Sequence, residues 1–133
     1  MTARIISRPV HAVLDYLSGI AMIASPWIFG FVGIAFARNI MLVVGIIVIL
    51  MSLFTNYEGG VSKKIAMSTH LWGDLFMGIF LVASPWLFFF AETVYIPHVA
   101  FGMLSIVASL LTVNSSQIKR HIPINFVYRR HRD

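Results

Sequence analysis

The chain has 133 residues, of which 59% are hydrophobic and 11% are charged. Soluble domains contain about 45–50% apolar and about 25% charged residues, so this composition excludes an ordinary soluble domain and favours a membrane protein. The mean hydropathy of +0.86 points the same way. The chain has no cysteine, which excludes disulfides, thiolate metal sites and thiol redox chemistry.

Four apolar stretches are long enough to cross a bilayer, which takes about 20 residues. They cover roughly residues 9–29, 36–55, 68–90 and 96–114. The segments between them are too short to form another domain. We therefore predict an all-α integral membrane protein, with a four-helix bundle in residues 1–114 and a basic cytoplasmic tail in residues 115–133.

The lysines and arginines predict the orientation, because cytoplasmic loops retain positive charge. Nine of the ten lie on one side of a four-span arrangement, and Arg38 lies on the other. Both termini are therefore expected in the cytoplasm, and the protein in the bacterial cytoplasmic membrane as a multi-pass protein. Five cations of the tail are expected to contact anionic lipid head groups rather than to dock a protein or nucleic acid: Lys119, Arg120, Arg129, Arg130 and Arg132.

The first and third spans are copies of one another. Residues 11–31 align without gaps on residues 70–90, with ten of the 21 positions identical. The second and fourth spans match more loosely. The chain thus contains two tandem repeats, about residues 9–55 and 68–114. Each has an even number of spans, so both have the same orientation in the membrane.

Each repeat contains a Ser-Pro-Trp tripeptide near the end of its first span. The six residues are Ser25, Pro26, Trp27, Ser84, Pro85 and Trp86. This duplicated pattern resembles the SPW-repeat family of small bacterial integral membrane proteins. The resemblance implies a membrane location and a two-helix repeat with the motif in its first helix, and it implies no particular activity.

The tripeptide has a structural interpretation. Pro26 lies about 26 Å along the first span at 1.5 Å per residue, close to the outer interface. Proline lacks the amide that would bond the carbonyl of Met22, so the helix is expected to bend or end there. The hydroxyl of Ser25 can compensate for the lost bond, and Trp27 suits the head-group region. A hinge for a gate at the outer face is the functional alternative.

A histidine and an aspartate, four residues apart, begin each repeat. His11 and Asp15, like His70 and Asp74, share one helix face. Ionisable groups at membrane depth usually face the bundle interior and often mark function. We interpret the pairs as polar clamps. The glycine four residues beyond each aspartate is expected to let the first and third spans approach closely.

Three alternatives remain open for these pairs. They are a proton or ion path, a metal site with two imidazoles and two carboxylates, and a haem between His11 and His70. No metal or cofactor is assigned from the sequence. His98, which follows Pro97 at the outer start of the fourth span, is expected at the membrane interface.

The sequence contains no phosphate-binding loop and no nucleophile-elbow motif, and its loops are short, so we do not expect an enzyme. The predicted function is a structural or interaction role in the membrane. The alternative is a small transporter or channel in which the His–Asp pairs relay protons or ions. The expected partners are the lipid bilayer and, in a homo-oligomer, further copies of the chain.

Overall fold

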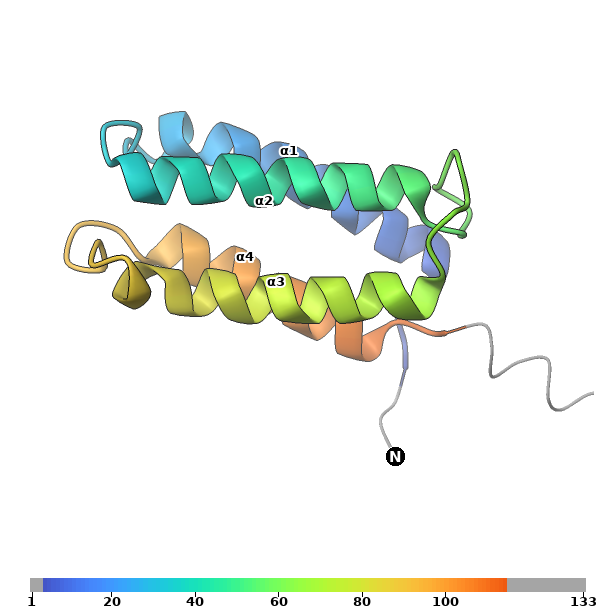
Figure 1. The fold of residues 1–133 in the computed structure, drawn as a ribbon. Coiled ribbons are helices and arrows are strands. Elements are labelled where there is room, and N and C mark those ends of the chain that lie inside the picture. The colour runs from blue at the N-terminus through green and yellow to red at the C-terminus, as the bar shows by residue number, and fades with distance from the viewer. Residues whose placement is uncertain (1–3, 115–133) are drawn as a thin grey trace, which may run out of the picture.

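The computed structural model describes residues 4–114, and four helices make up most of this part of the chain (Figure 1). The predicted all-α fold with four helices is confirmed, since residues 4–114 contain no strand beyond isolated bridges. Each helix lies within a few residues of its predicted span. Their bounds are α1 Arg8–Ile28, α2 Ala35–Phe54, α3 Met67–Leu87 and α4 Ile96–Leu111.

The helices form two hairpins, one from each repeat. α1 packs mainly against α2, and α3 mainly against α4, while the two hairpins stack on each other through fewer contacts (Figure 1). The connections 29–34 and 88–95 lie together at one end of the bundle, the hairpin end. The connection 55–66 lies at the opposite end, together with residues 4–7 and 112–114, and we call this the terminal end.

Glycines bring the helices of each hairpin together. A Cβ atom on Gly45 would lie 2.8 Å from the carbonyl oxygen of Gly19, and one on Gly102 would lie 2.7 Å from that of Gly78. The expectation that Gly19 and Gly78 bring the first and third spans together is therefore wrong. These glycines serve the contact inside each repeat, because the second helix of the repeat lies on that side of the first.

The terminal end closes with the same backbone pairing in both repeats. Ile65, just before α3, pairs with Thr55 at the end of α2, and Ile6, just before α1, pairs with Thr112 at the end of α4. The second pairing joins the two ends of the described chain, with the Ile6 amide bonded to the Leu111 carbonyl at 3.0 Å. The two hairpins are thus linked at both α2–α3 and α4–α1.

The Ser-Pro-Trp motifs end α1 and α3 at the hairpin end. Ser25 Oγ donates to the carbonyl of Met22 at 2.7 Å, and Ser84 Oγ donates to that of Leu81 at 2.8 Å. These are the carbonyls that proline leaves without an amide partner, so the predicted compensation is confirmed. Both helices end two residues after the proline.

The two repeats differ just beyond these helix ends. Gly30 has the left-handed φ of +73° that often terminates a helix. In the second repeat Phe89 holds the equivalent position with φ +57°, and its side chain is almost fully exposed.

The bundle buries many polar side chains and exposes many large apolar ones. Among residues 4–114, eleven polar or charged side chains are buried, nearly as many as the twelve buried hydrophobic ones. Large hydrophobic side chains are exposed along all four helices. By length and hydropathy, α2 is the one helix of this region that could span a membrane. α4 is apolar but has 16 residues.

Candidate functional site

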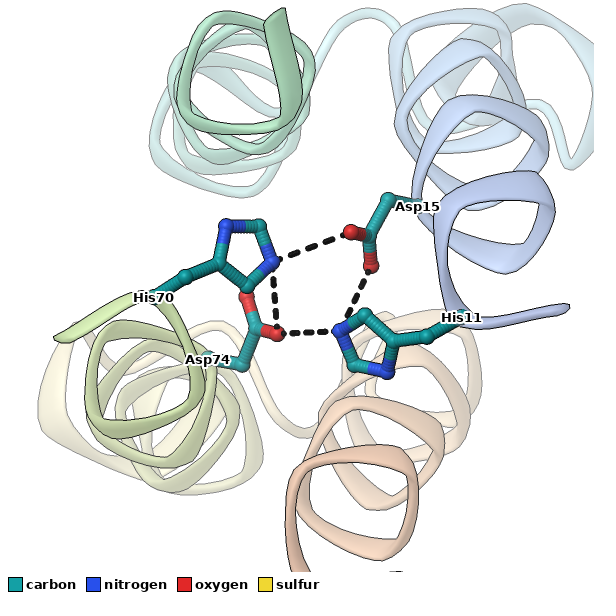
Figure 2. A group of neighbouring side chains, drawn as sticks. All are labelled: His11, Asp15, His70 and Asp74. Carbon is teal, nitrogen blue, oxygen red and sulfur yellow. Dashed lines mark hydrogen bonds and ion pairs between the residues drawn. The ribbon is translucent and has the colours of Figure 1, made fainter. Parts of the chain in front are cut away.

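The two His–Asp pairs meet in the interior near the terminal end (Figure 2). His11 and Asp15 come from α1, and His70 and Asp74 come from α3. We call these four residues the His–Asp cluster. All are buried, with both imidazoles fully inaccessible and at most 6% of either aspartate exposed.

Contacts of 3.0–3.4 Å connect the four side chains in a ring (Figure 2). Within each helix, the imidazole Nε2 approaches the aspartate four residues later, at 3.4 Å in α1 and 3.1 Å in α3. Across the repeats, His11 Nε2 lies 3.0 Å from Asp74 Oδ2, and His70 Nε2 lies 3.0 Å from Asp15 Oδ2. The helical spacing puts both side chains of each pair on inward faces, and the two pairs contact each other across the repeats.

A threonine from the other repeat contacts Nδ1 of each imidazole, the ring nitrogen that points away from the aspartates. Thr112 Oγ1 lies 2.7 Å from Nδ1 of His11, and Thr55 Oγ1 lies 2.7 Å from Nδ1 of His70. These threonines occupy matching positions just after α4 and α2. The alignment of the second span with the fourth places Thr55 opposite Thr112, but it does not indicate that each threonine contacts a histidine of the opposite repeat.

The aspartates differ in their remaining partners. Asp15 Oδ2 accepts hydrogen bonds from Ser52 Oγ at 2.9 Å and from the hydroxyl of Tyr57 at 3.2 Å. Ser109, the counterpart of Ser52, donates instead to a backbone carbonyl of its own helix. Burial raises the pKa of the Tyr57 phenol, and the charge of Asp15 raises it further, so the phenol stays protonated and donates.

Tyr57 reaches the cluster because the connection 55–66 folds over the terminal end. Tyr16 donates to the Gly59 carbonyl at 2.7 Å, and the guanidinium of Arg8 bonds the Asn56 carbonyl. The aromatic ring of Tyr57 is 1% exposed and lies 5.7 Å, centroid to centroid, from the imidazole of His70. The sequence analysis missed this residue, because nothing in a short polar connection indicates that one tyrosine turns inward.

Little free space adjoins the cluster. A cavity of about 10 Å³ lies against Asp15 and Asp74, and its other walls are mostly apolar. A water needs roughly 10–15 Å³, so the cavity is at the limit for a single molecule. Toward the hairpin end, the interior is filled by a hydrophobic core that includes Met22, Met41 and Leu81.

Other residues singled out from the sequence lie elsewhere. Ser25, Pro26, Trp27, Ser84, Pro85 and Trp86 are at the hairpin end, away from the cluster, and both tryptophan side chains are more than half exposed. The five tail cations, Lys119, Arg120, Arg129, Arg130 and Arg132, lie outside the described residues.

His98, expected at the membrane interface, lies in the first turn of α4 at the hairpin end, and its side chain is buried in the bundle. Its ring lies between Phe31 and Phe90, with centroid distances of 5.6 and 4.9 Å, and its Nε2 bonds the carbonyl of Ala37 at 3.1 Å.

The geometry limits what the cluster can bind. A haem held by His11 and His70 would need its porphyrin plane between the two Nε2 atoms, where both carboxylates lie. The cluster therefore does not fit a haem. Its ligand atoms all lie within 4.8 Å of one another, a spacing suited to protons or to one metal ion.

The family is indicated by a sequence comparison. The model of the SPW repeat domain matches residues 9–112, which contain the four helices except for Arg8 and include the whole His–Asp cluster. No curated protein and no solved structure gives a significant match. Because the match covers most of the chain and contains both Ser-Pro-Trp tripeptides, the protein belongs to the SPW repeat family.

Proposed function

We propose that this protein is a multi-pass membrane protein with a structural or interaction role, in which the His–Asp cluster holds the two repeats together. The observation that carries the proposal is that the polar contacts of the cluster cross between repeats. His11 contacts Asp74 and Thr112, both from the second repeat. His70 contacts Asp15 and Thr55, both from the first.

The distribution of charge supports the membrane placement of all four helices. The helices contain four Asp, Glu, Lys or Arg residues. Asp15 and Asp74 are buried in the cluster, and Arg8 and Arg38 lie in the first turns of α1 and α2. Charged side chains in membrane helices are costly unless they face the interior or lie near an interface. The long exposed apolar faces between these positions suit lipid.

Labelling of single cysteines tests this placement, since the natural chain has none. Ser62→Cys lies exposed in the connection 55–66, and Thr93→Cys lies exposed at the hairpin end. With the terminal end in the cytoplasm, a membrane-impermeant maleimide should label Thr93→Cys in spheroplasts and Ser62→Cys only in inverted vesicles. Phe76→Cys, on the exposed face of α3, should resist labelling from both sides. Labelling of all three in spheroplasts would disprove the placement.

A comparison of stability and proton flux in the purified protein distinguishes a structural clamp from a transporter. Asp15→Asn combined with Asp74→Asn removes both carboxylates while keeping the shape of the side chains. A clamp predicts a lower melting temperature in detergent and the same negligible proton flux in proteoliposomes as the natural chain. Proton flux by the natural chain that the double substitution abolishes would overturn the structural role and favour transport.

A further inference from the structure

The hydrogen bonds of Thr55 and Thr112 determine which nitrogen of each imidazole carries a proton. Thr55 Oγ1 donates to the Met51 carbonyl, and Thr112 Oγ1 donates to the Ala108 carbonyl, each at 2.6 Å. A hydroxyl has one proton, so neither threonine can also donate to a histidine. Each Nδ1 must therefore be the donor of the 2.7 Å bond to Oγ1. A neutral imidazole with its proton on Nδ1 presents a bare lone pair at Nε2.

Both lone pairs then face carboxylates. Nε2 of His11 and Nε2 of His70 point into the centre of the cluster, where Asp15 and Asp74 also point (Figure 2). Four acceptors without a proton or cation among them would repel one another. The centre of the cluster therefore requires a positively charged species.

Protons satisfy only one of the two imidazoles. His11 Nε2 lies in hydrogen-bonding geometry 3.0 Å from Asp74 Oδ2, but the other imidazole does not. His70 Nε2 is fully buried and lies 3.0 and 3.1 Å from two carboxylate oxygens, yet it has no partner in hydrogen-bonding geometry. A proton on this nitrogen would point between the two oxygens and bond neither well. A metal ion placed centrally accepts the lone pair without that directional mismatch, because it contacts all four ligand atoms at once.

The distances fit one tetrahedral ion. Bonds of about 2.0–2.1 Å from zinc to nitrogen and oxygen imply ligand–ligand separations of about 3.3 Å. One ligand atom from each of the four residues lies within 4.8 Å of the others. Three contacts to aspartate Oδ2 atoms are close to the expected ligand–ligand separation, at 3.0, 3.0 and 3.1 Å, and His11 Nε2 approaches the other oxygen of Asp15, Oδ1, at 3.4 Å. The threonines fix the ring orientation, which is the usual arrangement for histidine ligands of metals. Two carboxylates and one divalent cation sum to zero charge, which suits a buried site.

We propose that the His–Asp cluster binds one divalent transition-metal ion, Zn²⁺ in the first instance, through Nε2 of His11, Nε2 of His70 and one oxygen each of Asp15 and Asp74. Nitrogen and oxygen ligands in a tetrahedral arrangement favour zinc over magnesium or calcium, which take more oxygen ligands. This inference deepens the proposed structural role, on which it rests in part, because the ion would cross-link the two repeats.

The test uses the full chain purified in detergent. The chelator-treated protein is equilibrated with Zn²⁺ or Co²⁺, passed through a desalting column and analysed for metal content. We expect one ion per chain, a Co²⁺ visible spectrum of tetrahedral type, and X-ray absorption showing nitrogen and oxygen neighbours that include imidazole. His11→Gln with His70→Gln should lose the ion. His98→Gln, which changes an equally buried histidine outside the cluster, should retain it.

Two further measurements remain informative if the double substitution prevents folding. X-ray absorption needs only the natural chain. Thr55→Val leaves all four ligands in place and should weaken Zn²⁺ binding by about 10–100-fold, as loss of a partner behind a histidine ligand does. No bound ion in the natural chain, or an ion without imidazole neighbours, would overturn the metal site.

The metal site and the structural role can fail separately. If the chain binds no metal but Asp15→Asn with Asp74→Asn lowers its melting temperature, the metal site is disproved. The structural role is then supported, with protons in place of the ion. If the chain binds one Zn²⁺ per molecule but removing it leaves the melting temperature unchanged, the metal site stands and its structural role falls.

Discussion

Thr112 Oγ1 lies 2.7 Å from Nδ1 of His11, a residue 101 positions earlier in the chain. Thr55 stands in the same relation to His70. Each threonine follows the second helix of its repeat, and each histidine belongs to the first helix of the other repeat. The duplication therefore produces a reciprocal arrangement, in which each repeat supplies the threonine that orients the histidine of the other.

The threonine hydroxyls should contribute measurably to stability. Thr55→Val or Thr112→Val keeps the shape but leaves a buried imidazole N–H without its acceptor. Each should lower the free energy of unfolding by about 1–3 kcal/mol, measured by denaturant titration in detergent micelles. Thr93→Val, at an exposed position of the connection 88–95, should change it by no more than about 0.5 kcal/mol. Equal effects at the three positions would argue against the bonded arrangement.

The glycine contact within the second repeat should not tolerate even a methyl group. A Cβ at Gly102 would lie 2.7 Å from a backbone oxygen of α3, which cannot move aside without displacing the helix. Gly102→Ala should therefore cost about 1–3 kcal/mol, as overpacking typically does. Gly33→Ala meets no atom within 4 Å and provides the control. Melting temperatures that fall by the same amount in both variants would contradict this packing.

The serine of the Ser-Pro-Trp motif should contribute more to stability when the proline is present than when it is replaced. Ser25→Ala leaves the Met22 carbonyl without its donor and should cost about 0.5–1.5 kcal/mol. With Pro26→Ala already made, a backbone amide is restored at that position, and the serine substitution should cost less. Ser18→Ala is the matched control, because the Asp15 carbonyl that it bonds lies inside a regular helix. An equal cost of Ser25→Ala with and without the proline would contradict the interpretation.

Alkaline pH should weaken the attachment of the connection 55–66. Burial raises the pKa of Tyr57 above that of a free tyrosine, which is about 10. Its contribution to stability is fully present below pH about 10 and is lost as the pH rises toward the pKa of the folded state. Tyr57→Phe should therefore flatten the decline in stability above pH 10, by at most about 1.4 kcal/mol per pH unit.

The control for this titration is Tyr95→Phe, at a half-exposed tyrosine of the hairpin end. An identical pH dependence in the natural chain and in Tyr57→Phe would show that the phenol does not titrate with unfolding.

The sequence allowed the helices, the repeat and the shared helix face of each His–Asp pair to be predicted, because these depend on local rules. Span length follows from the 1.5 Å rise, and a spacing of four residues puts His11 and Asp15 on one face. The bond from Ser25 to the Met22 carbonyl could also be predicted, since proline removes one particular amide.

The remaining features depend on how the hairpins are rotated and stacked, which periodicity does not specify. Thr112 bonds His11 because α4 ends beside the start of α1, which the pattern of either repeat alone does not indicate. Gly19 was assigned to the wrong neighbouring helix for the same reason. Tyr57 reaches Asp15 only because the backbone of a short connection turns inward.

The most direct test of the account is a double-mutant cycle across the repeats, with His11→Gln and Asp74→Asn made singly and together. If the His–Asp cluster holds the repeats together, the two substitutions should be non-additive by at least about 1 kcal/mol in the free energy of unfolding, as for residues that share a polar network. His98→Gln with Asp74→Asn should be additive within about 0.5 kcal/mol. Additive costs for His11→Gln and Asp74→Asn would contradict the central claim.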